Sequence, residues 1–282
     1  MSAALRRACV MGHPVAHSRS PMIHGYWLRT LSIPGAYDLK DLSPDAFSGF
    51  VTNLAGHGYV GGNVTVPHKE AAFRLVAARD AAADAVGAVN TLWLDDGRLL
   101  GGNSDTHGFI ANLDERAPGW DLPGCRAVVL GAGGAGRSAV YALRQRGAEV
   151  HLVNRTLARA QELAARFAPG VHAHGFDAVP RLLREADLLV NCTSLGLAGK
   201  APLEIDLGPL KKSAVVYDVV YVPLETGLLR AARERGHRTV DGLGMLLQQA
   251  GFGFRKWFGG NPRVTPELRA MIEADIVAKA PR

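Results

Sequence analysis

Short apolar runs alternate along the first hundred residues with longer stretches in which apolar side chains recur every three or four positions. The short runs predict buried strands, and the longer periodic stretches predict helices. Asp95-Asp96-Gly97 predicts a hairpin turn. The expected strands are Arg7–Gly12, Tyr37–Asp41, Gly61–Pro67, Asn90–Leu94 and Arg98–Gly102. The expected helices are Pro21–Leu31, one that follows Ser43 as its N-cap, and the alanine-rich Ala71–Val86.

A break containing proline and glycine, Trp120–Gly124, precedes a second series of the same kind. Its expected strands are Arg126–Leu130, Glu149–Val153, Leu188–Cys192 and Ala214–Val219. Its expected helices are Gly134–Arg146, Leu157–Phe167, Gly244–Phe258 and Pro266–Ala278. Strands that alternate with helices are typical of α/β proteins with parallel sheets. We therefore expect a two-domain α/β protein with mainly parallel sheets: residues 1–105, residues 106–240, and C-terminal helices in 241–282 that return to the first domain.

Composition narrows the class of protein. Hydrophobic residues make up 48% of the 282, which is enough for a sizeable core. We find no apolar run of the ~18 residues that a membrane helix needs, and the run after Arg6-Arg7 ends at His13-Pro14, too early for a signal peptide. The three cysteines are widely spaced and indicate reduced core residues, so we expect a cytoplasmic protein. The net charge of +6 is scattered, which favours an anionic small molecule over nucleic acid or a membrane as partner.

A glycine-rich segment follows the expected strand Arg126–Leu130. Its residues are Gly131, Ala132, Gly133, Gly134, Ala135 and Gly136, which fit the pattern G-x-G-x-x-G. The first glycine allows a tight turn, the second allows the backbone to approach a pyrophosphate, and the third allows close packing of strand and helix. The helix that follows offers unpaired N–H groups to phosphates. Because a strand precedes the pattern and a helix follows it, the segment predicts a dinucleotide-binding Rossmann domain.

The end of the next strand indicates which dinucleotide is bound. An NAD site usually carries an acidic residue there for the ribose 2′-hydroxyl, whereas an NADP site accommodates a 2′-phosphate with arginine. Here the strand ends in Asn154, Arg155 and Thr156, and Arg159 follows one helical turn later. Two guanidinium groups in this position predict NADP(H). The competing interpretation is that both arginines are solvated surface residues.

Three polar clusters in the first domain lie at or just after expected strand ends, where open α/β sheets bind ligands. They are His17–Pro21, Asn63–Lys69 and Asn103–Asp105. Ser18 and Ser20 offer two hydroxyl donors, as a carboxylate ligand needs. Lys69 and Asp105 are candidates for an acid/base pair. From spacing alone, the interpretation of Lys69 as a solvated charge and Asp105 as a helix cap is the favoured one.

These residues belong to a set of motifs that resembles the shikimate dehydrogenase family nearly from end to end. The motifs of the first half are Gly12–Pro21, Gly62–Lys69, Gly87–Leu92 and Gly102–Asp105. Those of the second half are Gly131–Gly136, Asn154–Thr156, Asn191–Ser194, Tyr217–Tyr221 and Gly242–Ala250. The resemblance implies a substrate domain followed by an NADP-binding Rossmann domain. It also implies reversible NADPH-dependent reduction of 3-dehydroshikimate to shikimate, a step of chorismate and aromatic amino-acid biosynthesis.

The resemblance also implies roles for individual residues. Ser18, Ser20 and Tyr221 match residues that hold the shikimate carboxylate. The ring hydroxyls are bound in the family by residues that match Thr65, Lys69, Asn90, Asp105 and Gln249. Lys69 matches the catalytic lysine and Asp105 its partner. The 2′-phosphate is held by residues that match Asn154, Arg155, Thr156 and Arg159, and the nicotinamide pocket is lined by residues that match Thr193, Val219 and Gly242.

The chain departs from the family at a few positions. Thr106 stands where the family commonly has a glycine after the aspartate, so the loop expected after Asp105 need not have the family's conformation. His68 stands where an aromatic residue is frequent, and Ser20, rather than threonine, favours shikimate over quinate.

Other functions remain as alternatives. One is a quinate/shikimate dehydrogenase with relaxed substrate or cofactor use. Another is a non-catalytic NADP-binding regulator, which an intact Lys69 and Asp105 disfavour. The third is a metal hydrolase built on His13/His17 or His172/His174. We expect no metal there, because Pro14 disfavours a helix at the first pair and no acidic partner is evident beside either pair. Either a monomer or a homodimer fits the family.

Overall fold

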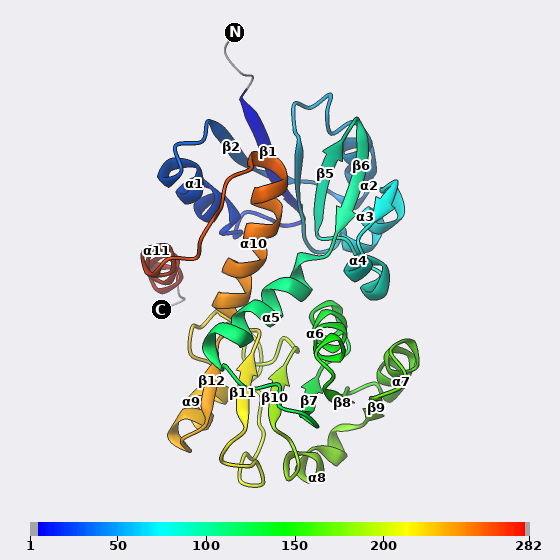
Figure 1. Cartoon of the computed structure of the whole chain (residues 1–282), viewed down its shortest axis with the longest axis vertical. Helices are drawn as coiled ribbons and strands as arrows, with labels where there is room; N and C mark the ends of the chain where they lie inside the picture. The colour runs from blue at the N-terminus through cyan, green and yellow to red at the C-terminus, as the bar shows by residue number, and fades with distance from the viewer. Residues whose placement is uncertain (1–4, 280–282) are drawn as a thin grey trace. The chain divides into compact units, whose positions relative to one another are not determined.

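Two six-stranded sheets organise the chain, one in each of two compact units (Figure 1). The structure, a computed structural model, describes residues 5–279. Of these, residues 5–104 and Leu247–Ile272 form the first unit, and Asp105–Leu246 with residues 273–279 form the second.

The sheet of the first unit has the strand order β2-β1-β3-β5-β6-β4. Its strands are β1 (Arg6–Gly12), β2 (Gly35–Asp41), β3 (Gly61–Val64), β4 (Ala78–Arg79), β5 (Thr91–Asp95) and β6 (Arg98–Gly102). β1 pairs in parallel with β2 and β3, whereas β5 is antiparallel to both β3 and β6. The antiparallel pair β5–β6 is the predicted hairpin, and Asp96 and Gly97 at its tip have φ of 46° and 75°, as this turn requires.

Helices cover both faces of this sheet. They are α1 (Ser20–Thr30), α2 (Pro44–Thr52), α3 (Lys69–Leu75), α4 (Ala81–Val86) and the part of α10 (Gly242–Phe258) that belongs to the first unit. Phe47 and Val51 of α2 pack with Cys9, Met11 and other strand residues in one core. Elsewhere in this unit, aromatic side chains of α1 and α10 surround His24. Ser43 occupies the predicted N-cap position of α2, although its side chain makes no capping hydrogen bond.

The prediction of one continuous helix over Ala71–Val86 is wrong, because the middle of this stretch is not helical. α3 ends at Leu75, the chain then forms β4 beside β6, and α4 starts at Ala81. The break occurs because Asp80 caps α4, its carboxylate accepting a hydrogen bond from the Ala83 N–H at 2.7 Å. The backbone of Asp80 meanwhile donates to Gly101 of β6. Strand pairing and this cap outweigh the helical preference of the alanines.

All strand pairs of the second unit are parallel, and the order is β12-β11-β10-β7-β8-β9. The strands are β7 (Arg126–Leu130), β8 (Glu149–Val153), β9 (Val171–His174), β10 (Leu188–Asn191), β11 (Val215–Asp218) and β12 (Arg238–Val240). This is the doubly wound Rossmann order, with the direction of progression reversing between β7 and β10. Ligands of such sheets bind beyond the carboxyl ends of the strands at that reversal.

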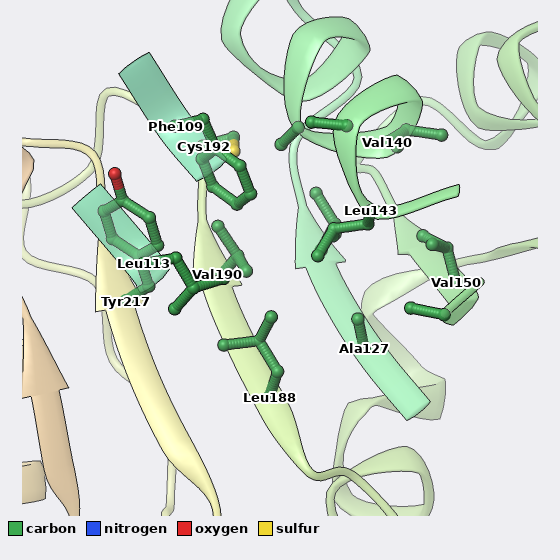
Figure 2. Close-up of a cluster of buried hydrophobic side chains, with 14 of the residues drawn as sticks. Phe109, Leu113, Ala127, Val140, Leu143, Val150, Leu188, Val190, Cys192 and Tyr217 are labelled. Atoms are coloured by element: carbon green, nitrogen blue, oxygen red, sulfur yellow. The ribbon is translucent and has the colours of Figure 1, made fainter. Parts of the chain in front are cut away.

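Two apolar cores sandwich the second sheet. α5 (Ser104–Arg116), α6 (Gly134–Gln145) and α7 (Leu157–Arg166) contribute to the first core, which Figure 2 shows with Phe109, Leu143 and Tyr217 among its members. α8 (Val179–Leu183) and α9 (Gly227–Glu234) contribute to the second, against Val128, Leu189 and Val216. A short 3₁₀ turn, Phe176–Ala178, precedes α8, and α11 (Pro266–Ala278) closes the described chain. All three cysteines are buried and unbridged, as predicted.

Candidate active site

The glycine turn begins directly after β7, at the predicted place. Gly131 has φ of 101°, a conformation that side chains disfavour. A Cβ at Gly136 would collide with the carbonyl oxygen of Gly131, so the third glycine lets α6 pack against the turn. A Cβ at Gly133 or Gly134, in contrast, would meet no atom within 4 Å. The backbone at the start of α6 is therefore approachable, as the binding of a pyrophosphate requires.

Asn154 connects this turn to the segment after β8. Its Oδ1 accepts a hydrogen bond from the backbone N–H of Ala132 at 3.1 Å, and its Nδ2 donates to the carbonyl of Thr156 at 2.9 Å. Both ends of the amide thus hold the backbone of the site in place. Arg155, Thr156 and Arg159 are exposed, and neither arginine forms an ion pair within residues 5–279. Two exposed guanidinium groups without a carboxylate partner fit a phosphate ligand.

A pocket of about 480 Å³ lies beside these residues within the second unit. Its lining residues are Asn154, Arg155, Phe176, Thr193, Ser194 and Leu195. Asn154, Arg155 and Thr193 were predicted site residues. Phe176 was not, because no sequence pattern indicated β9 or the turn after it. Ser194 and Leu195 follow the predicted strand β10, but neither was given a role, although Ser194 belongs to one of the family motifs. The volume and the exposed arginine fit part of a dinucleotide.

Two further predicted cofactor residues lie near the carboxyl ends of neighbouring strands. Val219 follows β11, and its N–H donates to the carbonyl of Asn191 at 3.0 Å. Gly242 opens α10 directly after β12, and a Cβ there would collide with the carbonyl oxygen of Val219. The glycine is therefore required for the close approach of these two segments. Tyr221, the predicted helper of the serines, follows β11 in the same unit.

In the first unit, Ser18 and Ser20 lie between β1 and α1. The Ser18 hydroxyl is 3.2 Å from the Ser20 hydroxyl and accepts a hydrogen bond from the Ser20 N–H at 3.3 Å. Ser20 is the first residue of α1. The two hydroxyl groups are thus adjacent, at the N-terminus of a helix, where an anion is favoured.

Thr65 and Lys69 follow β3, whose last residue pairs with Met11 of β1. The Thr65 N–H donates to the Met11 carbonyl at 2.9 Å, so the segments after both strands leave the same edge of the sheet. Lys69 is the first residue of α3. The preceding His68 is buried, its ring stacked on Phe47 with centroids 4.2 Å apart. His68 therefore serves as the aromatic residue expected there and fixes the backbone that carries Lys69.

Asn90 lies just before β5 and is buried. Its Oδ1 is within hydrogen-bond distance of three donors, the Ser104 N–H at 2.8 Å, the Thr91 hydroxyl at 2.9 Å and the Ser104 hydroxyl at 3.1 Å. Because donors occupy its oxygen, the group that this amide can offer a ligand is its NH₂. Gln249 lies on α10, and its Oε1 is buried without a hydrogen-bond partner among residues 5–279. An unsatisfied acceptor of this kind fits a hydroxyl-bearing ligand.

Asp105 is the second residue of α5. Thr106, which replaces a common glycine, lies in the first turn of the same helix and has no positive φ. The loop expected at this position is thus helical, and glycine is not needed. Asp105 belongs to the second unit, whereas Lys69 belongs to the first.

The structure describes no metal centre and no membrane segment. Within residues 5–279, no group of three or more His, Cys, Asp or Glu side chains is arranged to hold a metal ion. The expectation that the histidine pairs lack acidic neighbours was wrong, because His13 lies 2.6 Å from Asp41 and His172 lies 3.2 Å from Glu149. None of the helices in the described part of the chain is long and apolar enough to cross a membrane.

Comparison with known proteins gives the same family for both halves of the chain. Residues 10–92 match the family model of the shikimate dehydrogenase substrate-binding domain, and residues 113–198 match that of shikimate/quinate 5-dehydrogenase. The shikimate dehydrogenase (NADP(+)) of Mesorhizobium japonicum is 58% identical over 99% of this chain and 100% of its own length. That of a Chelativorans species is 55% identical over 99% of both chains.

Solved structures extend this similarity to the fold. Shikimate 5-dehydrogenase from Thermus thermophilus, in complex with NADP(H) and shikimate, has 38% sequence identity and a TM-score of 0.85, with coverage of 96% of this chain and 100% of that one. Quinate dehydrogenase from Corynebacterium glutamicum, in complex with NAD, has 29% identity and a TM-score of 0.88, with coverage of 96% and 99%. With relatives above half identity along the whole length, this chain belongs to the shikimate dehydrogenase family.

Proposed function

We propose that the chain catalyses the reversible reduction of 3-dehydroshikimate to shikimate with NADPH, in the biosynthesis of chorismate and the aromatic amino acids. The observation that carries the proposal is identity of 54–58% to shikimate dehydrogenases (NADP(+)) along almost the entire chain. The residues that the chemistry needs are also present in the two units. Residues 1–105 form the substrate domain, residues 106–240 form the cofactor domain, and 241–282 contain the returning helices.

The cofactor site uses the glycine turn and the segment after β8. The backbone N–H groups of Gly133–Gly136 at the start of α6 bind the pyrophosphate. Arg155 and Arg159, together with Thr156, hold the 2′-phosphate with charge-assisted hydrogen bonds. Asn154 joins the glycine turn to the segment after β8 through its two hydrogen bonds. Thr193, Val219 and Gly242 line the nicotinamide end. NADPH, when bound there, supplies the hydride.

The substrate site uses the polar clusters of the first unit, and the match to the family's motifs adds Tyr221 and Asp105. Ser18 and Ser20 donate hydrogen bonds to the carboxylate, assisted by Tyr221. Thr65, Asn90 and Gln249 bind the ring hydroxyls; Asn90 contributes its NH₂ group because three donors occupy its oxygen. This donor set recognises a hydroxylated ring that carries an acid group.

Lys69 is the proton donor for the reduction. Its ammonium group stabilises the developing alkoxide and transfers a proton to the oxygen, and in the reverse direction the neutral amine accepts the hydroxyl proton. Asp105 orients the amine and binds the ring as well.

The test is an absorbance assay of NADPH formation from NADP⁺ with shikimate, run beside quinate and beside NAD⁺. We expect shikimate with NADP⁺ to be preferred by at least about tenfold in kcat/KM over every other combination, the scale of one good polar contact. Absence of shikimate-dependent NADPH formation would overturn the proposal. Comparable rates with quinate would instead identify a quinate/shikimate dehydrogenase, a role favoured by the similarity to the Corynebacterium structure.

We also propose that the enzyme is cytoplasmic and acts as a monomer or homodimer. The three buried, unbridged cysteines support a reducing compartment. Light scattering on a size-exclusion column measures the assembly state directly, and a mass above that of a dimer would contradict this part of the proposal.

A further inference from the structure

A buried carboxylate, that of Asp218, lies at the carboxyl end of β11. In the parallel register Asp218 pairs with Asn191, the last residue of β10, and both are fully buried. Burial raises the pKa of Asp218 above its ordinary value, and hydrogen bonds from Thr226, Val220 and Asn191 offset only part of that rise. A buried polar group of this kind persists only where hydrogen bonds replace its hydration. The proposed chemistry uses neither residue.

Asp218 accepts hydrogen bonds from three separate segments. Its Oδ1 accepts from Asn191 Nδ2 at 2.9 Å and from the Val220 N–H at 3.0 Å. Its Oδ2 accepts from the hydroxyl of Thr226 at 2.7 Å. Thr226 is the N-cap of α9, and its hydroxyl in turn accepts from the Leu229 N–H. One carboxylate thus joins the end of β10, the segment after β11 and the start of α9.

Two acceptors face the NH₂ of the Asn191 side chain: the Asp218 carboxylate at 2.9 Å and the Leu195 carbonyl at 3.2 Å. A carboxylate only accepts hydrogen bonds, so Asn191 must present its NH₂ to Asp218 and its oxygen elsewhere. That oxygen accepts from the Thr193 N–H at 3.0 Å and from the Thr193 hydroxyl at 2.7 Å. The Thr193 hydroxyl then accepts from the Leu195 N–H at 3.1 Å. The chain of bonds ends in the loop Thr193–Leu195, which forms one wall of the 480 Å³ pocket.

We infer that Asp218 is a positioning residue for the cofactor: by fixing the amide orientation of Asn191, it holds the loop Thr193–Leu195 in the shape that binds NADP(H). The inference rests on the proposed function, since it assigns the pocket to the cofactor. Asp218 does not line the pocket, so its effect on cofactor affinity passes through the groups that it bonds, Asn191 beside the loop and Val220 after the cofactor residue Val219. Buried polar networks in which every member is satisfied specify one arrangement of the groups they connect.

The experiment removes the hydrogen bond between Asp218 and Asn191 from either side. Asn191→Asp places a second carboxylate opposite Asp218 and removes the amide donor, so the pair can no longer form without an extra proton. Asp218→Ala removes the acceptor, whereas Asp218→Asn keeps an amide oxygen that accepts from Asn191 and Val220 and places its NH₂ beside the Thr226 hydroxyl. We expect Asn191→Asp and Asp218→Ala to bind NADP⁺ at least about tenfold more weakly than wild type, and Asp218→Asn to bind to within about threefold of wild type.

Hydrogen exchange separates positioning from a simple charge effect on an anionic ligand. In the ligand-free enzyme, the amides of Thr193 and Leu195 should exchange faster in Asn191→Asp and Asp218→Ala, and at the wild-type rate in Asp218→Asn. Thr226→Val is the matched control, because it removes a hydrogen bond donated to the same carboxylate but leaves the bond from Asn191 in place. It should lower the melting temperature while leaving NADP⁺ affinity and the exchange of 193–195 unchanged.

Unchanged exchange and unchanged NADP⁺ affinity in Asp218→Ala would overturn the inference, as would an Asp218→Asn variant that binds NADP⁺ no better than Asp218→Ala. If Asn191→Asp does not fold, Thr193→Val tests the same chain of bonds, since it removes only the hydroxyl that accepts from Leu195. A normal exchange rate for the Leu195 amide in that variant would again count against the inference. Failure of the wild-type enzyme to bind NADP⁺ would instead refute the proposed function.

Discussion

The side-chain oxygen of Asn90 accepts a hydrogen bond from the backbone N–H of Ser104, at 2.8 Å, and thereby caps the N-terminus of α5. The first N–H groups of a helix have no partner within it, so an oxygen from a distant segment satisfies one of them. The Ser104 hydroxyl lies 3.1 Å from the same oxygen. Ser104 thus holds the amide that we assign to a substrate hydroxyl, and the next residue, Asp105, is the proposed partner of Lys69.

Ser104→Ala should therefore weaken substrate binding without removing the cap. One of three donors to Asn90 is lost, which at about 1 kcal/mol predicts a three- to tenfold higher KM for shikimate. The KM for NADP⁺ should not change. Ser104→Thr, which keeps the hydroxyl, should restore the wild-type KM in steady-state kinetics. Equal KM values for the alanine variant and the wild type would show that the hydroxyl does not position Asn90.

Lys69→Ala should lower kcat by roughly a hundredfold or more, because it removes the proposed proton donor. Lys211→Ala is the matched control: Lys211 lies just before β11 and pairs with Asp187 at 2.8 Å, away from the carboxyl ends of the strands. Its kcat should equal that of the wild type. Initial rates of shikimate oxidation measure both variants, and near-native turnover without Lys69 would make it a structural residue only.

Replacing Arg155 and Arg159 together by glutamine should raise the KM for NADP⁺ by at least about tenfold, since each charged hydrogen bond contributes on the order of 1.5–3 kcal/mol. The KM for NAD⁺, which has no 2′-phosphate, should change little. Arg166→Gln removes an arginine from the last turn of the same helix, α7, and is the control. An equal rise in the KM values for NADP⁺ and NAD⁺ would show that these arginines do not bind the 2′-phosphate.

Phe176→Ala tests a pocket residue that the sequence did not reveal. Its ring lines the pocket and also packs against the second core of the nucleotide unit. If the ring contacts the cofactor, its loss should weaken NADP⁺ binding about tenfold, within the range of base–aromatic stacking. Titration calorimetry gives the Kd, and Phe176→Tyr should bind like the wild type. A wild-type Kd in a folded alanine variant would confine Phe176 to packing.

His24 should make the protein sensitive to acid. Its side chain is fully buried, burial lowers its pKa from 6.5 to about 3, and neither ring nitrogen has a hydrogen-bond partner among residues 5–279. Between these pKa values the unfolded chain binds the proton and the folded chain does not, so stability falls as pH falls below 6.5. The loss approaches about 1.4 kcal/mol per pH unit.

His24→Phe keeps a ring beside Tyr37, on which His24 stacks with centroids 4.1 Å apart, and removes this titration. Urea unfolding at several pH values should show the free energies of unfolding of variant and wild type diverging from pH 6.5 downward, with the variant less affected. Parallel pH profiles would mean that His24 is protonated equally in the folded and unfolded chains.

The sequence by itself determined the class of fold and the type of cofactor, because both depend on local chemistry. A buried strand, a glycine turn and a helix are consecutive in Arg126–Gln145, and the conformation of Gly131 follows from its lack of a side chain. Arg155 and Arg159 likewise follow β8 closely in the sequence, so their place beside the end of this strand could be predicted. The sequence also identified Ser18, Ser20 and Lys69 as candidates, since each stands next to a strand end.

Only the tertiary structure decided what depends on contacts between distant segments. The alanine-rich stretch 71–86 breaks because β6 pairs with Ala78 and Arg79, which no local propensity encodes. Asn90 is oriented by Ser104, and Asn191 by Asp218, across separations of 14 and 27 residues. Phe176 reaches the pocket through a strand that the apolar pattern did not reveal. Which end of a side-chain amide donates and which accepts depends on the residue that it faces. The residues next to it in the sequence do not reveal that partner.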